Sequence, residues 1–590
     1  MGGDILLYPS GGYETELLSY SADENGNFTI TGEDPQLIFR NVDSCIGHIE
    51  LKLGEPAAQD IRVQLYYMTG GDFSEERSFV DFIPAGGGSL GFELGGIKCG
   101  ALRFDIDGDF QLEGLRAERT VSLSINDILL TELVFLIALA AYGIWRSLPE
   151  REDRLSFGEL VFWLLCSGYF FVWSCTKPYN YAPDEYMRYS VSKFIFENNR
   201  LPVGAETTDN PWGFSYAQMP TMMCNFLGYI PMKLVSLFTS DDYALVVASR
   251  FGSVICGSVC LLFLMKLSKL MIKKPFHRIM IAFVALMPQF CFLCSYINND
   301  ICALCGAAMI LYSWVLIIKE GWHSSLSVIM ALGIGICGIS YYNSYGWVLM
   351  SVIMLLSYII INKDDRKRLF KQGLLISGIA LAVIAFPFVR QYVVFGDLLG
   401  FKVTSEYGEL YAMESLKPSV RRALTIRAQG IPLWDMLFGM GWLRTVYKSF
   451  IGVFGYMAYP VHPVVTRGYF LLLCGMAGIM VYIIVRNIKN ITRENIIKEY
   501  RYIIFYVCLI GSMVIPVVLS IVYSYANDYQ AQGRYIYSMM PGLALFFGLA
   551  YSELFGKIKN IRVQRAVTAA LCGVMVIFNG WAFFGTYLPS

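Results

Sequence analysis

The pattern of polar and apolar positions divides the chain near residue 126. Up to that point the sequence is polar and rich in glycine. Beyond it, apolar runs of roughly bilayer-spanning length recur almost to the C-terminus. The pattern therefore predicts two domains, residues 1–126 and residues 127–590.

The first domain shows the period-two alternation of half-buried strands. The runs at 49–53, 61–65 and 102–107 alternate apolar with polar side chains, and Gly-rich turns separate such runs. Short alternating strands with turns predict a β-sandwich, jelly-roll-like in form. Sandwiches of this kind resemble carbohydrate-binding modules, although a fold does not decide a function. Three aromatic residues are either a sugar-stacking face or ordinary core and rim residues: Tyr66, Tyr67 and Phe73.

The second domain is predicted to hold about twelve membrane-spanning helices. They lie near 128–145, 157–175, 243–265, 277–296, 301–318, 324–341, 345–361, 373–389, 469–485, 502–522, 535–553 and 566–588. Four connections between them are rich in lysine and arginine, near 266–278, 363–371, 486–501 and 557–565. All four fall on one side of the alternating count, which makes that side cytoplasmic. The N-terminal domain and the loops 176–242 and 390–468 are then extracytoplasmic.

One apolar run, from Pro220 to Phe238, does not fit the alternating count. It is interrupted by polar and helix-breaking residues, and a span here would put later basic loops on opposite sides. We predict an interfacial or re-entrant helix at the outer surface, with a thirteenth span as the alternative. Because residues 1–126 are exported in this topology without a leading apolar segment, we also expect an upstream helix to be missing from the sequence.

Composition narrows the class of protein further. The chain is 55% hydrophobic and 15% aromatic, which is typical of a membrane protein. Lys+Arg equals Asp+Glu at 47 each, so the chain lacks the basic surplus of a nucleic-acid-binding protein. Of the 15 cysteines, only Cys45 and Cys99 lie in the first domain. A disulfide between them and two free thiols are both open possibilities there.

The first outer loop carries the acidic residues that stand out. It reads Lys177-Pro-Tyr-Asn-Tyr-Ala-Pro183-Asp184-Glu185-Tyr-Met-Arg188, directly after a predicted span. Pro183 favours the start of a helix with Asp184 and Glu185 in its first turn, where the helix dipole stabilises carboxylates. Helix capping is therefore one explanation of the pair. The other is function, because acidic residues beside membrane spans are candidates for it.

Three motifs lie on the same predicted side of the membrane. They are Pro183-Asp184-Glu185, Asn298-Asn299-Asp300 and Gln532-Gly533-Arg534-Tyr535, with a further stretch at Ser449–Tyr456. Through these motifs, over roughly residues 157–553, the chain resembles the GT-C glycosyltransferases, membrane enzymes that take a sugar from a polyprenyl-phosphate carrier. It resembles more closely an uncharacterised family of bacterial predicted membrane proteins. The resemblance implies a GT-C-like fold and a catalytic acidic residue in the first outer loop. One departure is Arg188, which stands where a histidine is expected.

Sugar transfer from a lipid phosphate needs a base for the acceptor hydroxyl and cations for the departing phosphate. We expect Asp184 to be the base and Glu185 its partner or a substrate orienter. Asp300 either completes the acidic site or is an ordinary helix N-terminus. No cofactor is certain, but a divalent cation, Mg²⁺ or Mn²⁺, has Asp184, Glu185 and Asp300 as its expected ligands.

Cationic and polar residues near the same side are the expected substrate-binding groups. The loop from 390 to 467 holds nine Lys/Arg against five Asp/Glu, which runs against the usual charge bias of outer loops. Binding of an anionic lipid carrier and attraction to anionic headgroups both explain this surplus. The expected substrate-binding residues are Arg188, Asn298, Asn299, Arg390, Arg421, Arg422, His462, Gln532, Arg534 and Tyr535.

The sequence therefore predicts a multi-pass cell-membrane protein with an extracytoplasmic β-sandwich and a GT-C-like helical domain. Its expected function is inverting transfer of a sugar from a polyprenyl-phosphate carrier to a cell-surface glycan or glycolipid at the outer face. Membrane lipids are further expected partners, and nucleic acids are not. The alternatives are a transporter or flippase for polysaccharides or lipid-linked sugars, and a non-catalytic sugar-binding membrane protein.

Overall fold

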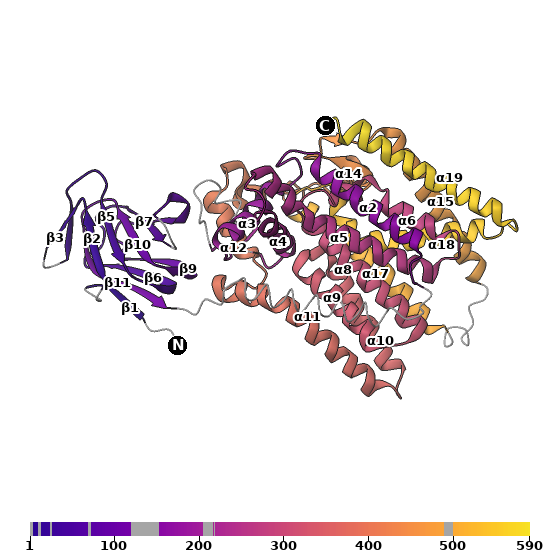
Figure 1. The fold of residues 1–590 in the computed structure, drawn as a ribbon, viewed down its shortest axis with the longest axis horizontal. Coiled ribbons are helices and arrows are strands. Elements are labelled where there is room, and N and C mark those ends of the chain that lie inside the picture. The colour runs from indigo at the N-terminus through magenta and orange to yellow at the C-terminus, as the bar shows by residue number, and fades with distance from the viewer. Residues whose placement is uncertain are drawn as a thin grey trace. The chain divides into compact units, whose positions relative to one another are not determined.

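The computed structural model describes residues 4–9, 13–23, 26–68, 72–119, 153–203, 216–217, 219–488 and 499–590. Its contacts form two compact units, each visible in Figure 1. The first unit comprises Met1–Thr131, Glu197–Met219 and Gln391–Met413, and the second comprises Glu132–Phe196, Pro220–Arg390 and Glu414–Ser590. The first unit thus combines the N-terminal region with two short segments from later in the chain. The span expected near 128–145 lies outside the described residues.

The N-terminal strands form a β-sandwich of two antiparallel sheets. One sheet has the order β3 (Tyr20–Ala22), β4 (Asn27–Ile30), β11 (Phe110–Arg119), β6 (Ser44–Leu53) and β9 (Ser89–Cys99), with β1 (Asp4–Tyr8) also paired to β11. The other has the order β2 (Glu14–Leu18), β5 (Gln36–Arg40), β10 (Ala101–Ile106), β7 (Ile61–Met68) and β8 (Ser78–Ile83). Alternate residues such as Ile49 and Leu51 on β6, and Val63 and Leu65 on β7, enter one shared core. The alternation in the sequence therefore predicted this architecture correctly.

Tyr66 and Tyr67 are buried members of this unit and do not form an open sugar-stacking face. Tyr66 donates its hydroxyl to Glu75 Oε1 at 2.6 Å, and the Tyr67 hydroxyl accepts a hydrogen bond from Arg200 Nη2 at 2.5 Å. Phe73 is half-buried. Of the two alternatives for these aromatic residues, the structure supports core and rim packing.

Cys45 and Cys99 are free thiols on neighbouring strands. Ser44 lies opposite Cys99 and Cys45 lies opposite Lys98 in the β6–β9 register. Adjacent positions on a strand point to opposite faces of the sheet. Cys45 and Cys99 therefore face away from each other, which opposes a disulfide between them.

Nine helices among the described residues are long and apolar enough to cross a membrane. They are α2 (Phe157–Cys175), α5 (Asp242–Met271), α8 (Asn299–Glu320), α10 (Tyr345–Ile361), α11 (Arg366–Phe395), α15 (Pro463–Ile488), α17 (Tyr500–Ala526), α18 (Met540–Phe555) with the 3₁₀ turn η6 (Gly533–Met539) before it, and α19 (Ile561–Ala582). The shorter helices include α3 (Glu185–Asn198), α4 (Met223–Val235), α6 (His277–Ala285), α7 (Pro288–Leu293), α9 (Ser324–Ser340), α12 (Phe401–Tyr411), α13 (Pro418–Ala423) and α14 (Trp442–Gly452). Each of these long helices coincides with an expected span.

Two apolar runs differ from an uninterrupted span. The run expected as one helix near 277–296 is broken between α6 and α7, where Met287 has an extended backbone before Pro288. Proline disfavours helical geometry in the residue that precedes it, and it has no N–H to donate, so the break follows from this residue. The run at 220–238 forms α4, whose 13 residues span about 20 Å and fall short of a bilayer core of about 30 Å. That length agrees with a helix that does not cross the membrane.

Helix α8 is at the centre of the second unit, where it packs against α5 and α9 (Figure 1). The whole apolar part of α8 is buried inside the protein, whereas only 22% of α2 and 6% of α15 are buried. A charged side chain on α5 or α8 can therefore face protein instead of lipid. Arg250 in the first half of α5 donates to the carbonyl oxygen of Ser174 at the end of α2, so these two helices meet at this end of the bundle.

Candidate active site

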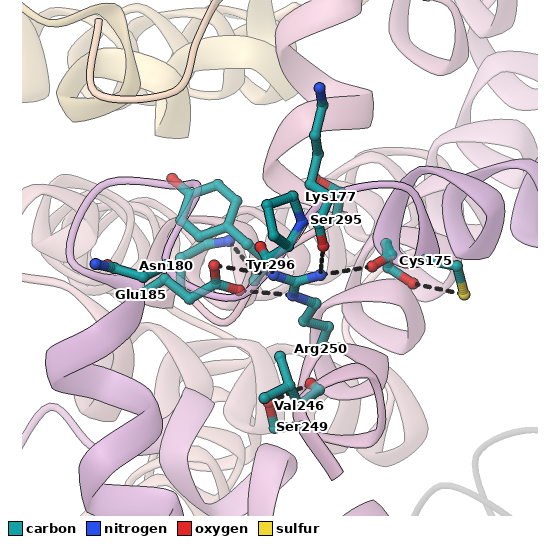
Figure 2. Close-up of polar contacts among 12 residues, drawn as sticks. Cys175, Lys177, Asn180, Glu185, Val246, Ser249, Arg250, Ser295 and Tyr296 are labelled. Atoms are coloured by element: carbon teal, nitrogen blue, oxygen red, sulfur yellow. Dashed lines mark hydrogen bonds and ion pairs between the residues drawn. The ribbon is translucent and has the colours of Figure 1, made fainter. Parts of the chain in front are cut away.

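Arg250 on α5 fixes the loop between α2 and α3 (Figure 2). Its Nε and Nη2 donate to the two carboxylate oxygens of Glu185, at 2.6 and 3.0 Å. Three further N–H groups donate to the carbonyl oxygens of Ser174, Lys177 and Pro178, at 2.7 to 2.8 Å. All five guanidinium donors are thus used, and both charged side chains are 1% exposed. Glu185 is therefore a structural anchor of the loop, and its expected role as a partner of Asp184 or a substrate orienter stays a prediction.

Asp184, next to this anchor, has a backbone φ of +62°. This left-handed conformation is uncommon for residues other than glycine, and it concentrates at functional sites. Helix α3 begins only at Glu185, and the carbonyl oxygen of Asp184 accepts the N–H of Arg188 at 3.1 Å. Asp184 therefore precedes the helix and is not in its first turn as expected. The Arg250 anchor at Glu185 helps to hold this backbone conformation.

The Asp184 carboxylate is paired with Arg534 from the late sequence motif. Arg534 Nη2 donates to Asp184 Oδ2 at 2.7 Å, and Nε donates to Gln532 Oε1 at 2.7 Å. The Tyr535 hydroxyl also accepts from Nη2, at 3.0 Å. The arginine side chain is 8% exposed and the Asp184 side chain is 27% exposed. The carboxylate thus has a fixed direction while part of it stays accessible.

Gly533, in the same motif, lies directly against the backbone of α14. Its N–H donates to Ser449 Oγ at 2.6 Å. A Cβ at this position would lie 2.2 Å from the backbone nitrogen of Phe450 and 2.5 Å from its Cα. Only glycine fits this approach, which sets the direction of the following Arg534.

Asn298 and Asn299 use their amide groups to hold the protein together. Asn298 caps α8 by accepting the N–H of Ile301 at 3.0 Å, and its Nδ2 donates to the carbonyl oxygens of Leu293 and Tyr296 at 2.7 Å. Asn299 accepts the N–H of Cys224 at 2.9 Å, which ties α8 to α4. These contacts position the turn before α8, whereas substrate binding by the two amides was expected.

Asp300 follows them in the first turn of α8 and is 7% exposed. Its Oδ1 has no hydrogen-bond partner among the residues that the structure describes. Arg534, Arg188 and Asp184 are the charged side chains that interact with it electrostatically. Arg188 is itself buried on α3, with Nη1 3.7 Å from Cys224 Sγ. The structure thus brings the three sequence motifs into one cluster of two carboxylates and two guanidinium groups.

Tyr296 belongs to this cluster, and the sequence analysis missed it. Its ring is buried, and its hydroxyl interacts electrostatically with Arg534, Asp300 and Asp184. A cavity of about 10 Å³, enough for about one water molecule, adjoins it. The cavity is lined by Pro183, Gln289, Phe292, Tyr296, Ser449, Val453, Gly455, Met457, Gln532, Gly533 and Arg534. The only signal in the sequence was the position of Tyr296 two residues before Asn298.

Arg421 connects to the cluster through a chain of polar contacts. Its Nη1 donates to Asp528 Oδ2 at 3.3 Å, and the same oxygen accepts from Gln530 Nε2 at 2.7 Å. Gln530 Oε1 accepts the Tyr535 hydroxyl. Arg421 and Arg422 are both exposed on α13. A chain of polar contacts therefore connects the exposed Arg421 to the Arg534–Asp184 pair.

His462 and Arg390 are two further residues expected to bind substrate. His462 is exposed and stacks on Trp581 with ring centroids 4.3 Å apart, while its Nδ1 accepts the N–H of Val464 at 3.3 Å. Arg390 is half-buried on α11, and its role in substrate binding stays a prediction.

The stretch Ser449–Tyr456 also reaches the Asp184 loop. Tyr456 donates its hydroxyl to Asn180 Oδ1. Burial raises the pKa of Tyr456, and the negative charges of Asp184 and Glu185 raise it further. Its hydroxyl therefore remains a hydrogen-bond donor at neutral pH. At the start of the loop, burial lowers the pKa of Lys177, because it disfavours the charged ammonium form.

The arrangement does not fit a divalent cation held jointly by Asp184, Glu185 and Asp300. Both oxygens of Glu185 bind Arg250, and Asp184 is paired with Arg534. Within the described ranges, no three His, Cys, Asp or Glu side chains are grouped so as to hold a metal ion.

Comparisons with solved structures find similar chains at low identity. The oligosaccharyltransferase of Archaeoglobus fulgidus, in complex with Zn and sulfate, is 15% identical with a TM-score of 0.42 over 71% of this chain and 52% of its own. Its apo form gives 14% identity and a TM-score of 0.43 over 71% and 55%. The arabinosyltransferase EmbB of Mycobacterium smegmatis gives 12% identity and a TM-score of 0.41 over 97% and 58%. The chain thus matches little more than half the length of each of these proteins.

A search of curated proteins finds no match. A family model does match, under the description "Predicted membrane protein (DUF2142)", over residues 190–543. The matched region includes Asp300 and Arg534 and begins just after Asp184. It covers more than half of the chain, and nine helices within the described residues have the length and composition of membrane spans. The chain therefore belongs to this family of predicted multi-pass membrane proteins.

Proposed function

We propose that the protein is a membrane glycosyltransferase of the GT-C type. In this proposal it moves a sugar from a polyprenyl-phosphate carrier to a hydroxyl group of a cell-surface glycan or glycolipid. The observation that carries the proposal is the Asp184 carboxylate, held by Arg534 from a left-handed backbone position and still 27% exposed. A carboxylate with a fixed direction and partial exposure is what a general base requires.

The reaction is a single displacement at the anomeric carbon. Asp184 takes the proton of the acceptor hydroxyl as the acceptor oxygen bonds to C1 of the sugar. The bond between C1 and the phosphate oxygen breaks on the opposite side, and polyprenyl phosphate leaves with the bonding electron pair. Attack from the opposite side inverts the configuration at C1. The exposed guanidinium groups of Arg421 and Arg422 are the groups we assign to the departing phosphate.

Glu185 and Arg250 have a positioning role in this proposal. Both carboxylate oxygens of Glu185 are occupied, so Glu185 cannot accept a proton without loss of the ion pair. The pair instead fixes the residue that follows Asp184 and the loop that leads to it.

The charge distribution supports an outer location for the site. In the sequence, the lysine- and arginine-rich connections follow α5, α10, α15 and α18, whereas Asp184 precedes α3 and Asp300 lies at the beginning of α8. Basic loops mark the cytoplasmic side. In this proposal Asp184 and Asp300 are extracytoplasmic, as is expected for the N-terminal β-sandwich, and the site faces both a lipid-linked donor and a surface glycan.

The test is transfer by the purified full chain in lipid nanodiscs, supplied with undecaprenyl-phosphate hexoses and a panel of glycan and glycolipid acceptors. Asp184→Asn should lower the rate by about 10²- to 10⁴-fold, because it removes the base while preserving the shape of the side chain. Asp435→Asn is the matched control, since Asp435 is an exposed carboxylate elsewhere in the outer loops, and it should retain the wild-type rate. Equal rates in Asp184→Asn and wild type would refute the assigned base. No transfer from any donor by the wild type would contradict the proposed function.

A further inference from the structure

Two buried polar atoms in the cluster have no hydrogen-bond partner among the described residues: Tyr296 Oη and Asp300 Oδ1. The two side chains are 2% and 7% exposed. A buried polar group without a partner costs free energy, so each such group needs a physical explanation. Tyr296 lies in the short segment between α7 and α8, Asp300 lies in the first turn of α8, and both interact electrostatically with Arg534. Their common location indicates one binding site.

The Tyr296 side chain is held in place before any ligand arrives. Asn298 Nδ2 donates to the backbone carbonyl oxygen of Tyr296 at 2.7 Å, and the Tyr296 ring packs against Phe292 with ring centroids 4.9 Å apart. The side chain lines the small cavity beside Pro183 and Arg534. A preorganised phenol in this position offers its O–H as a hydrogen-bond donor next to the Asp184 loop.

The charges of the cluster indicate what kind of group it can bind. Asp184 and Asp300 together balance Arg534 and Arg188 when all four are ionised. A phosphate would add negative charge to a buried cluster that has no positive surplus, which is unfavourable. A hydroxyl group adds no charge. It can donate to Asp300 Oδ1 and accept from Tyr296 Oη, which satisfies both atoms.

We infer that Tyr296 and Asp300 bind one hydroxyl group of the transferred sugar and thereby determine which sugar is accepted. The inference rests on the proposed function for the identity of the ligand. It assigns the carrier phosphate to other groups, since the buried cluster accommodates a neutral hydroxyl and Arg421 and Arg422 are exposed nearby. A site built to hydrogen-bond a hydroxyl rejects an analogue without it, because its own polar groups are then left unpaired.

The test is equilibrium binding to the full chain in nanodiscs, measured by calorimetry. The probes are undecaprenyl phosphate, a panel of undecaprenyl-phosphate hexoses, and the monodeoxy analogues of the hexose that binds best. Tyr296→Phe and Asp300→Asn should each weaken binding of that hexose by about 10- to 100-fold, the usual cost of a lost buried hydrogen bond. One monodeoxy analogue should bind the wild type and Tyr296→Phe equally. Undecaprenyl phosphate should bind all variants alike.

Tyr537→Phe is the matched control. Tyr537 is also a buried tyrosine whose hydroxyl lacks a hydrogen-bond partner in the described part of the chain, but its electrostatic neighbours are Cys291, Cys294, Cys260 and Tyr469. It should bind every probe like the wild type. Circular dichroism shows whether each variant is folded, and Asp300→Asn provides a second test if Tyr296→Phe does not fold.

Three results would overturn the inference. They are hexose binding unchanged in both variants, weaker binding of sugar-free undecaprenyl phosphate in Tyr296→Phe, and no hexose bound by the wild type. Binding that depends on Tyr296 without any transfer would support this site and contradict the proposed reaction. Transfer that depends on Asp184 but not on Tyr296 or Asp300 would support the proposed reaction and contradict this site.

Discussion

Replacement of Arg250 by methionine should strongly destabilise the second unit. The change leaves the Glu185 carboxylate, which is 1% exposed, without its cation, and breaking a buried ion pair costs about 3–5 kcal/mol. Three carbonyl oxygens also lose their donors, each at a cost of about 1–3 kcal/mol where water does not replace it. We therefore expect Arg250→Met to lower the free energy of unfolding by at least about 3 kcal/mol.

Glu185→Gln should cost less than Arg250→Met, because the three carbonyl contacts of Arg250 are preserved. The double change Arg250→Met with Glu185→Leu should cost less than the single changes Arg250→Met and Glu185→Leu added together, since the double variant leaves no buried charge uncompensated. Both singles should also slow transfer, because the loop that carries Asp184 loses its anchor. The assay is equilibrium denaturation in mixed micelles followed by circular dichroism.

Arg486→Met is the matched control for this prediction. Arg486 pairs with Glu553 at 2.8 Å, a distance close to that of the buried pair, but the two side chains are 45% and 38% exposed. Exposed pairs contribute at most about 1 kcal/mol. Equal destabilisation by Arg250→Met and Arg486→Met would refute the reasoning from burial.

Further predictions concern packing, capping and thiols. Gly533→Ala should cost about 1–3 kcal/mol, because its Cβ meets the backbone of α14, whereas Gly573→Ala, with nothing within 4 Å, should be neutral or slightly stabilising in the same denaturation assay. Asn298→Ala should cost about 1–2 kcal/mol through loss of the helix cap, and Asn298→Asp should lose less because it retains the capping oxygen. Burial raises the pKa of Cys99 to about 12, so in the folded protein at pH 8 it should react with alkylating reagents far more slowly than Cys45. Mass spectrometry without reduction should find both thiols modified after unfolding, and a disulfide-linked peptide would contradict the free-thiol assignment.

The sequence predicted the β-sandwich and the positions of the long helices well. Helix α2 occupies the expected residues 157–175 and α10 the expected residues 345–361. The break before Pro288 was missed, although proline at that position was visible in the sequence. The length of an apolar run is a local property, whereas a single proline ends a helix only where the surrounding packing accommodates the break.

The candidate site was predicted in part. The motifs at Asp184, Asp300 and Arg534 do meet, as their shared placement suggested. Glu185 was taken for a catalytic residue because it adjoins Asp184, but adjacent residues at a helix start point in different directions. Its partner Arg250 is on α5, and nothing in the local sequence links the two. Tyr296 was missed for the same reason.

By itself the sequence determined the division into a strand-rich domain and an apolar helical domain, the length of the helices, and the residues available for chemistry. These features depend on local alternation and on runs of apolar residues, which burial in a core or a membrane requires. Only the tertiary structure decided which polar groups are paired. Helices that are apolar around their whole circumference give no sequence signal for the direction they face. Asp184 and Arg534 are far apart in the chain, so their 2.7 Å contact is set by helix packing. The same packing leaves the Tyr296 hydroxyl and Asp300 Oδ1 with no partner among the described residues.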